Sequence, residues 1–410
     1  MRFLPFIAAS TGIASCADID MEGLPNTGLD TSDWTTGEAP PLSDLVNLDD
    51  IQIAAKNALS AKAYAYYRTA ALDEVTYNAN LFIWNKIRLN GFSFADVSNA
   101  NLKTSILGHE FSAPFFIAPA AKAGKANETA AEAGLVQAAG AAGILYIPSI
   151  SSTLDIEEIA AASNASDQIM FHQEYIWSNT TRLKDELSRI ENSGFKALVL
   201  TVDNTGVNGI RNRHMRFSSA SSSEDLHSAD FTIPALQKLR NMTSLPIIPK
   251  GVKTAHDVKL CADLGFPAAY ISNHGGRVVD LAPTAVEILL DVHRLYPEVF
   301  GQIEIYADGG VRRATHILTL LALGVRAVGL GRSAMFANLY GAEGVGKMIR
   351  ILKEELESTM KLMGQADIDG YRGNMTFVNT KQVELEYFGK ALDEDLSSTP
   401  FVFGNRTYGR

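Results

Sequence analysis

The chain has 410 residues, of which 46% are hydrophobic and 20% are charged, and its formal net charge is −10. So large an apolar fraction supports an extensive buried core and excludes a fibrous or wholly disordered protein. The acidic balance, without any basic block, argues against binding to nucleic acid or to an anionic membrane surface. Two cysteines, Cys16 and Cys261, are too few for a disulfide framework or a zinc site built on thiolates.

The N-terminal segment has the pattern of a secretory signal peptide. Arg2 precedes a short apolar run over residues 3–14, and small residues follow up to Ala17. We predict a signal peptide over residues 1–17, with a disordered tail as the main alternative. A bacterial lipoprotein box over residues 13–16 is a second alternative. This run is too short to span a bilayer, and no other stretch is long and apolar enough to do so.

Glycosylation sequons also favour a secretory destination. The composition would give roughly two or three Asn-x-Ser/Thr triplets by chance, but the chain has six, which begin at Asn127, Asn164, Asn179, Asn241, Asn374 and Asn405. We therefore predict a secreted glycoprotein, with a cytoplasmic location as the alternative. Residues 18–41 predict an irregular lead-in and 393–410 a C-terminal tail, whose last three residues are not a peroxisomal signal.

Between these ends, short apolar runs alternate with helical patterns. Eight runs predict strands at residues 115–119, 144–149, 169–175, 197–203, 245–251, 268–275, 304–310 and 327–332. Helices are predicted between them, at residues 129–142, 155–162, 179–193 and 254–264 among others. Apolar strands that alternate with helices indicate a parallel sheet covered on both faces. We predict an α/β fold, a (β/α)8 TIM barrel within residues 42–392.

Two helical segments flank this barrel, and one connection inside it is long. Residues 50–67 predict a helical lead-in, and residues 346–363 predict a long amphipathic helix after the last strand. About 40 residues separate the fourth and fifth strands, and the Ser/Ala-rich residues 218–223 within them predict a mobile loop on the catalytic face.

Polar residues gather where the predicted strands end, which is the face on which barrel enzymes carry out chemistry. The residues at these strand ends are Pro119-Ala120-Ala121, Ser149, Gln173, Tyr175, Thr201, Asp203, Lys250, Ser272 through Arg277, Asp308 through Arg312, Gly331 and Arg332, and most of them are polar or glycine. The glycines and arginines after strands seven and eight suit a phosphate, because backbone N–H groups and guanidinium forks both bind phosphate oxygens. Ordinary tight turns are the alternative for these glycines.

Residues 329–334 also match the dinucleotide fingerprint G-x-G-x-x-A. That fingerprint requires a strand that opens a βαβ unit, with an acidic residue near the tip of the next strand. Here the match follows the last predicted strand and precedes a long helix, so we reject an NAD site.

The cluster after strand six is the sharpest catalytic signal. His274 is a natural base near neutral pH, and Arg277 suits a carboxylate because its planar fork donates two parallel hydrogen bonds. Asp203, two strands away, is placed to orient the imidazole. Tyr66 and Tyr175 are candidate donors to substrate oxygens.

Lys250, at the end of strand five, suits a site beside an electron-accepting ring, with a buried ion pair as the alternative.

Taken together, these motifs resemble the FMN-dependent 2-hydroxy-acid oxidase and dehydrogenase family, which includes glycolate oxidases, lactate oxidases and cytochrome-linked lactate dehydrogenases. The resemblance covers about residues 42–392. It rests on Ser272 through Arg277 with Asp280, on Leu245-Pro246 through Lys250-Gly251-Val252, on Leu200 through Asp203, on Asp308 through Arg313 with Gly331-Arg332, and on Tyr66-Tyr67.

The resemblance implies a role for each matching residue. His274 would be the active-site base, taking either the Cα proton or the hydroxyl proton, and Asp203 would be its partner. The implied substrate ligands are Tyr66, Tyr175, Arg211, His274 and Arg277. The implied FMN ligands are Pro119, Ala120, Ala121, Ser149, Gln173, Tyr175, Thr201, Lys250, Ser272, Asp308, Gly309, Gly310, Val311, Arg312, Gly331 and Arg332. No metal is implied, and a homo-oligomer is expected.

Four departures from the family pattern matter. Residues 127–130 replace the usual His-Pro-acid-Gly, Ala70 replaces a glycine, and Arg211 aligns only after one inserted residue. Ser151 stands where glycolate oxidases carry a bulky aromatic residue, which predicts a roomier pocket for longer or aromatic substrates.

We expect an (S)-2-hydroxy acid to be oxidised to the 2-oxo acid, with O2 as acceptor because no haem-binding domain is expected before the barrel. A dehydrogenase that passes electrons to a cytochrome or quinone is the first alternative. A flavin-binding barrel without turnover is the second, and a phosphate-binding barrel isomerase is the third.

Overall fold

The structure is a computed structural model that describes residues 23–163, 167–204, 209–217 and 227–389. The predicted signal peptide, the Ser/Ala-rich loop at 218–223, the C-terminal tail and the sequons at Asn164 and Asn405 lie outside the described residues. Residues 23–41 contain no helix or strand. In the described part of the chain, no helix combines the length and the apolar character that a membrane crossing needs.

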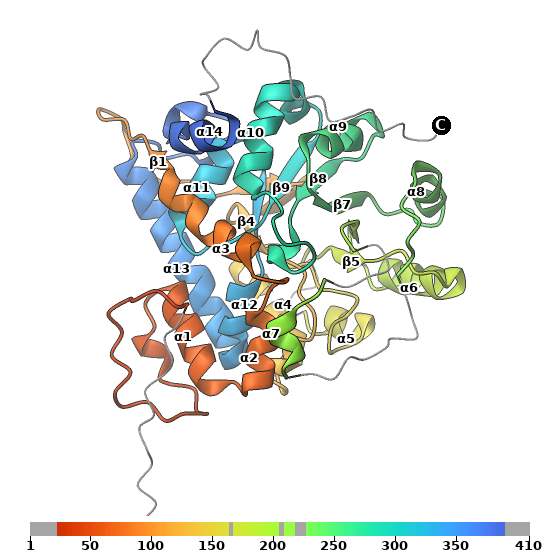
Figure 1. Cartoon of the computed structure of the whole chain (residues 1–410), viewed down its shortest axis with the longest axis horizontal. Helices are drawn as coiled ribbons and strands as arrows, with labels where there is room; N and C mark the ends of the chain where they lie inside the picture. Colours follow the sequence, from red (N-terminus) through yellow and green to blue (C-terminus); the bar gives the residue numbers. More distant parts are fainter. Residues whose placement is uncertain (1–22, 164–166, 205–208, 218–226, 390–410) are drawn as a thin grey trace, which may run out of the picture.

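A parallel sheet of seven strands forms the centre of the molecule, with the spatial order β4-β10-β9-β8-β7-β6-β5 (Figure 1). The strands are β4 (Phe115–Ile117), β5 (His172–Glu174), β6 (Leu198–Thr201), β7 (Ile247–Val252), β8 (Ala268–Ile271), β9 (Glu304–Ala307) and β10 (Ala327–Leu330). Every residue of β6, β7, β8 and β10 is buried, as expected of strands covered on both faces. These strands confirm seven of the eight predicted positions.

The remaining predicted strand, residues 144–149, is the second along the chain, and it closes the ring through isolated bridges in place of a regular ladder. Tyr146 forms parallel bridges with both Ile117 and Met170, and Ser149 forms one with Gln173. Pro148 has no N–H to donate, so a continuous ladder cannot pass through it. The fold is therefore a (β/α)8 barrel whose second strand is irregular.

Inside the barrel, side chains fill the space between the strands. Phe116, Phe171, Tyr270 and Tyr306 belong to one buried cluster, whereas Phe115, a neighbour of Phe116 in β4, packs outwards against the helices. The cluster also contains Ile106 and Phe111, from a hairpin that precedes the barrel, β2 (Thr104–Ile106) and β3 (His109–Phe111). The interior is thus a packed core, and only the carboxyl ends of the strands remain available for a site.

Helices surround the sheet. They are α4 (Ala131–Ala142), α5 (Ile156–Ala161), α6 (Thr180–Asn192), α8 (Ile233–Arg240), α9 (Ala255–Asp263), α10 (Ala285–Leu295), α11 (Ala314–Ala322), α12 (Arg332–Ala337) and α13 (Gly341–Leu362). Local capping explains several of their starts. Asn179 caps α6 and Thr254 caps α9, and Thr284 with Glu287 forms a capping box at α10. The long helix α13, predicted after the last strand, begins at Gly341, five residues before the predicted start at residue 346.

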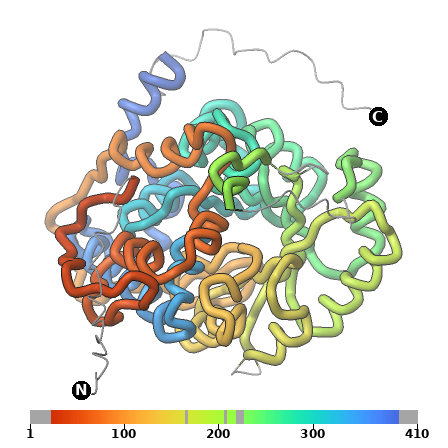
Figure 2. The backbone as a smooth tube through the Cα atoms, turned by 60° about the horizontal axis from the view of Figure 1, so that its bottom comes forward, coloured from red at the N-terminus to blue at the C-terminus, as the bar shows by residue number. Residues whose placement is uncertain are grey.

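The helical lead-in is two helices, where the sequence predicted one segment over residues 50–67. They are α1 (Leu48–Ala58) and α2 (Ala61–Arg68), and the side chain of Ser60 caps α2 by accepting from the N–H of Ala63. These N-terminal helices lie beside the C-terminal helices α12 and α13 (Figures 1 and 2). The lead-in is therefore packed onto the barrel.

Smaller elements complete the fold: α3 (Val75–Phe82), α7 (Asn212–Met215), α14 (Lys381–Phe388) and the antiparallel pair β1 (Arg88–Leu89) and β11 (Val378–Asn379). The helix α3 reaches the site because Asp280, in the loop after β8, accepts hydrogen bonds from the N–H groups of Thr76 at 2.8 Å and Asp73 at 3.2 Å. A carboxylate at a helix N-terminus is stabilising there because that end carries partial positive charge.

Candidate active site

A cavity of about 590 Å³ opens at the carboxyl ends of the barrel strands, beside α2, α3 and α7. Nearly all of the sequence-predicted site residues line it. They are Tyr66, Pro119, Ala120, Ala121, Ser149, Gln173, Tyr175, Thr201, Arg211, Lys250, His274, Arg277, Asp308, Gly309, Gly310, Val311, Arg312, Gly331 and Arg332. The other two, Asp203 and Ser272, lie just behind it and contact residues that line it.

His274 and Asp203 form a dyad in which the carboxylate is buried and the imidazole is partly exposed. The imidazole Nδ1 lies 3.0 and 3.2 Å from the two carboxylate oxygens, and the side chain of Asp203 is only 1% exposed. Burial alone would raise the pKa of Asp203, but His274, and then Lys250, outweigh it and hold that pKa below its ordinary value. A carboxylate that stays ionised fixes the ring so that Nε2 is the nitrogen available to the cavity.

Two local features hold this dyad in place. His274 begins the short helix η4 (His274–Gly276) with a left-handed φ of 56°, and its N–H donates to the hydroxyl of Ser272 at 3.1 Å. Gly251 has a φ of +95°, and a Cβ there would lie 2.5 Å from the Asp203 carboxylate. Any side chain at position 251 would therefore push this carboxylate aside.

Two arginines converge on one backbone carbonyl beside the dyad. Arg277 and Arg211 each donate to the carbonyl oxygen of Tyr66 at 2.9 Å. Burial, together with the nearby charge of Arg277, lowers the pKa of Arg211 to about 9. Two guanidinium groups held this close repel each other, so a bound carboxylate would relieve that repulsion. The inserted residue before Arg211 does not prevent it from reaching the site.

Tyr175 forms the adjacent wall. Its ring stacks on His227 with centroids 3.8 Å apart and an interplanar angle of 14°. Burial, and then the nearby Asp203, raise the pKa of Tyr175. Its hydroxyl therefore stays protonated at neutral pH and can donate a hydrogen bond into the cavity.

Hydrogen bonds link the ends of several barrel strands. Ser149 donates to the Oε1 of Gln173 at 2.9 Å, and the Nε2 of Gln173 donates to Thr201 at 3.0 Å. The ammonium of Lys250 donates to the hydroxyl of Ser272 at 3.3 Å and lies 4.0 Å from Asp308. Because Lys250 is 4% exposed, its charge acts on whatever fills the cavity with little screening by water.

The arginine and glycine groups after β9 and β10 form a basic pocket. Arg312 donates to Ser333 and to Gln52, at 3.1 and 3.2 Å. Arg332 donates to the carbonyls of Tyr67 and Gly275, both at 2.9 Å, and burial lowers its pKa to about 9. A buried guanidinium bound mainly by carbonyls favours an anion beside it.

Several lining residues come from segments that the sequence did not assign to the site. Tyr77 and Asn80 lie on α3, and His214 and Met215 lie on α7. Asn80 and Asn273 exchange two amide hydrogen bonds of 2.9 Å, which attaches α3 to the loop after β8. Only the pairing with this distant loop identifies Asn80, so no local signal could have found it.

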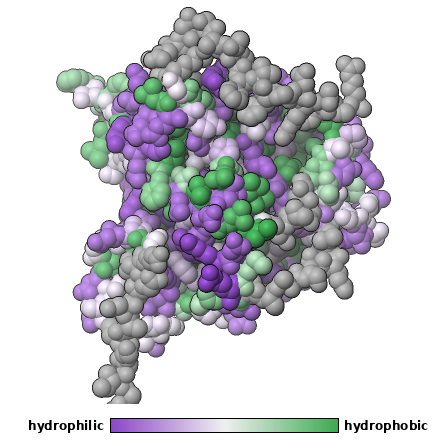
Figure 3. All heavy atoms as spheres, viewed as in Figure 1, coloured by the Kyte–Doolittle hydropathy of each residue, from purple (hydrophilic) through white to green (hydrophobic). Residues whose placement is uncertain are grey.

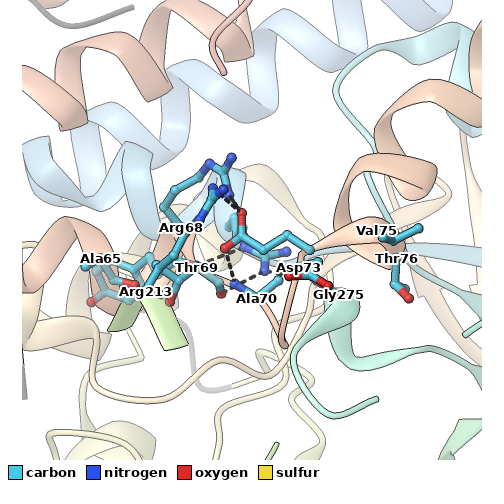
Figure 4. A network of polar contacts seen from close by, with 12 residues as sticks. Ala65, Arg68, Thr69, Ala70, Asp73, Val75, Thr76, Arg213 and Gly275 are labelled. Atoms are coloured by element: carbon cyan, nitrogen blue, oxygen red, sulfur yellow. Dashed lines mark hydrogen bonds and ion pairs between the residues drawn. The ribbon is translucent and has the colours of Figure 1, made fainter. Parts of the chain in front are cut away.

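Glu74, just before α3, gathers cations and backbone around the entrance. Its carboxylate, 1% exposed, accepts from Arg68 at 3.0 Å, from Arg213 at 2.9 Å and from the N–H of Ala70 at 2.8 Å. Figure 4 shows Arg68, Ala70 and Arg213 converging from different elements. This network ties α2 to α7 and places Ala70, where the family carries a glycine, in a buried turn.

The loop at residues 127–130, which departs from the family pattern, is held by hydrogen bonds of Asn127. Asn127 accepts from the N–H of Ala130 at 2.9 Å and donates to the carbonyl of Leu339 at 3.2 Å. The buried carboxylate of Glu132 accepts from the N–H groups of Ala123 and Thr153, at 2.9 and 2.8 Å, so it joins the loops after the first two strands.

Ser151 does not line the cavity. The roomier pocket predicted from this serine stays a prediction. The outer wall is formed instead by residues of the segment around α7, among them Ile210, His214 and Met215. Apolar side chains are also exposed near the start of α3 and in the loop after β8, where Leu281 is 79% exposed. Figure 3 shows an apolar patch near the centre of the face that it draws, among hydrophilic residues.

The fold and the cavity define an α/β-barrel protein of the class that holds a phosphate-bearing cofactor and a small anion at the carboxyl ends of its strands. The family model described as FMN-dependent dehydrogenase matches residues 55–224 and 217–376. A peroxisomal (S)-2-hydroxyacid oxidase from Arabidopsis thaliana is 33% identical over 367 residues, which cover 84% of this chain and 99% of that relative. The chain belongs to the FMN-dependent dehydrogenase family.

Other relatives and solved structures support the same family assignment. L-lactate dehydrogenase (cytochrome) from Saccharomyces cerevisiae is 32% identical over 368 residues, 83% of this chain, and this chain spans 62% of that relative's length. The flavin-binding domain of baker's yeast flavocytochrome b2 superposes with a TM-score of 0.79 and 31% identity, covering 88% of this chain and 91% of that domain. A mandelate oxidase variant gives a TM-score of 0.73 at 28% identity, covering 82% of this chain and 98% of that one.

FMN fits the observed donor set. Arg312 and Arg332 suit its phosphate, and a Cβ on Gly331 would meet no atom within 4 Å, which leaves room for a ligand at that backbone. Ser149, Gln173 and Thr201 offer hydroxyl and amide groups for the polar edge of an isoalloxazine ring. Lys250 brings a buried positive charge to the same side of the cavity.

Proposed function

We propose that this protein oxidises an (S)-2-hydroxy acid to the corresponding 2-oxo acid. The single observation that carries the proposal is the His274–Asp203 dyad, held 3.0 Å apart beside two arginines that share one carbonyl. A base next to a carboxylate-binding pair is what this reaction requires of a protein. The printed names of the relatives, 2-hydroxyacid oxidases and cytochrome-linked lactate dehydrogenases, support the same reaction.

Each residue of the site has its own role in this reaction. Arg277 and Arg211 bind the substrate carboxylate and fix its orientation, and the hydroxyls of Tyr66 and Tyr175 donate to substrate oxygens. His274 takes a proton from the substrate at Nε2, because Nδ1 is engaged by Asp203. The ionised carboxylate of Asp203 then stabilises the imidazolium.

Bound FMN supplies the acceptor for the two electrons that leave the substrate. Lys250 contributes a buried positive charge that favours a negatively charged ring beside it, and Asp308, 4.0 Å away, holds the ammonium in position. The aromatic wall of Tyr175 and His227 keeps water away from one side of the dyad.

The test is anaerobic bleaching of the flavin absorbance by a panel of (S)-2-hydroxy acids. Wild-type protein should bleach with at least one of them, and His274→Gln should retain FMN but lose this reduction. A yellow protein that no 2-hydroxy acid bleaches would refute the proposal and favour a flavin-binding barrel without turnover. Reduction of His274→Gln at the wild-type rate would remove His274 from the reaction.

We also propose O2 as the electron acceptor, which the oxidases among the relatives support. A cytochrome or quinone is the alternative, supported by the cytochrome-linked relatives. Stopped-flow mixing of the reduced protein with O2 separates the two. Reoxidation much slower than turnover with an artificial acceptor would contradict the oxidase.

Secretion and glycosylation remain proposals from the sequence. Expression in a eukaryotic secretory system should give an N-terminus after residue 17 and a mass decrease on treatment with an N-glycosidase. An unprocessed, unglycosylated product would contradict both. Light scattering on the purified protein tests the predicted homo-oligomer.

A further inference from the structure

Tyr66, which lines the cavity, is surrounded by more positive charge than one carboxylate requires. Three cations surround the ring of Tyr66: the Cζ atoms of Arg277 and Arg211 lie 5.3 and 5.5 Å from its centroid, and the Nζ of Lys125 lies 5.1 Å from it. Lys125 is exposed at the end of the short helix η3 (Ala123–Lys125), after the first barrel strand, and it lies beside Tyr66 just outside the residues that line the cavity. The net charge of the chain is −10, so this cluster runs against the charge of the whole protein.

The carboxylates near this cluster of cations bind other groups. Asp203 binds His274, Glu74 binds Arg68 and Arg213, and Asp280 binds the N-terminus of α3. Within the described parts of the chain, no ion pair joins Arg211, Arg277 or Lys125 to an acidic side chain.

The charges of this cluster also act on a neighbouring histidine, His214. The pKa of His214 is lowered to about 4, first by burial and then by the charges of Arg211, Arg277, Lys125 and Lys62. Its ring lies edge-on to Tyr66, with centroids 5.7 Å apart. This side chain is therefore neutral at pH 7, and it adds polarity to the wall without adding charge. The excess positive charge belongs to the arginines and lysines.

We propose that the substrate is a 2-hydroxy acid that carries a second, distal carboxylate, and that Lys125 binds this second group. The inference rests on the proposed function, because Arg277 and Arg211 are taken to hold the carboxylate next to the reacting carbon. A monoanion neutralises one unit of charge at this entrance, whereas a dianion also neutralises Lys125. The long, exposed stem of a lysine lets the ammonium follow a flexible distal group.

The experiment compares pairs of substrates with equal chain length. (S)-2-Hydroxyglutarate is set against (S)-2-hydroxyvalerate, and (S)-malate against (S)-2-hydroxybutyrate, by flavin reduction and by kcat/KM. We expect the dicarboxylate of each pair to have the higher kcat/KM. This preference should shrink as the ionic strength rises, because salt screens charges near solvent.

A matched pair of variants assigns the effect to one side chain. Lys125→Met keeps the stem and removes the charge, and it should lower kcat/KM for the dicarboxylates by about fivefold, as for a partly exposed ion pair. The monocarboxylates should change little. Lys122→Met is the control on the same loop, because the ammonium of Lys122 instead donates to the carbonyl of Ser152 at 3.3 Å. FMN content verifies that both variants fold.

Each outcome bears on the proposal. Equal or better use of the monocarboxylates by the wild type overturns the second-carboxylate inference and leaves the proposed function intact. A dicarboxylate preference that survives Lys125→Met overturns the assignment to Lys125. Failure of every 2-hydroxy acid to bleach the flavin overturns the proposed function, and this inference falls with it.

Discussion

Replacement of Asp203 by Asn tests whether the dyad provides the base. In the folded protein His274 Nδ1 lies 3.0 Å from a carboxylate that is 1% exposed. Two unit charges at that distance interact by about 5.5 kcal/mol at an effective dielectric constant of about 20. An amide keeps a hydrogen bond but not the charge, so roughly half of this energy should be lost when the imidazolium forms.

A loss of about 3 kcal/mol corresponds to about 100-fold in rate. Stopped-flow flavin reduction under anaerobic conditions measures this rate directly, at saturating substrate. Asp230→Asn, a change at an exposed carboxylate away from the cavity, is the control and should leave the rate unchanged. Reduction by Asp203→Asn within fivefold of wild type, with normal FMN content, would refute the argument that this carboxylate stabilises the imidazolium.

The other predictions concern the arginine pair and the groups that position the site. Arg277→Lys should raise KM and lower kcat, since a point charge cannot keep the geometry of a planar fork; unchanged kinetics would mean that the carboxylate is held elsewhere. Because the pKa of Arg211 lies at about 9 and the side chain loses its positive charge above it, KM should rise as the pH passes about 9. Substrate affinity that is flat to pH 10, with FMN retained, would contradict this. Gly251→Ala should slow flavin reduction and lower Tm, as its Cβ would lie 2.5 Å from Asp203 and its φ is +95°. A crystal structure of this variant with the dyad undisturbed would refute that steric argument. Glu132→Gln should destabilise the fold by about 1–3 kcal/mol, because its amide would face a backbone N–H. Chemical denaturation measures this loss, and an unchanged midpoint would contradict it.

The residues that could be predicted are those that lie at the ends of barrel strands. Strand ends follow from local patterns, since a buried parallel strand is an apolar run and the polar residue after it marks the edge. Once the barrel is assumed, all such residues meet at one face, so His274, Lys250 and Arg312 could be grouped from their positions alone. The structure places all three together in or beside the same cavity.

Other parts of the site depend on contacts that no local pattern encodes. Asn80 reaches the cavity through its amide pair with Asn273, 193 residues away, and Gln52 reaches Arg312 across 260 residues. Neither residue was assigned a role from the sequence, because the helices that carry them, α3 and α1, have ordinary amphipathic patterns.

The sequence by itself therefore determined the barrel and the face on which its polar strand ends meet, because both depend on residue type and on the period of the chain. Only the tertiary structure decided which charges gather at the entrance. Arg211, Arg277 and Lys125 surround Tyr66 from three separate loops, and the nearby acids Asp203, Glu74 and Asp280 bind other groups. Whether a charge is neutralised depends on its neighbours in space, and folding alone brings those neighbours together.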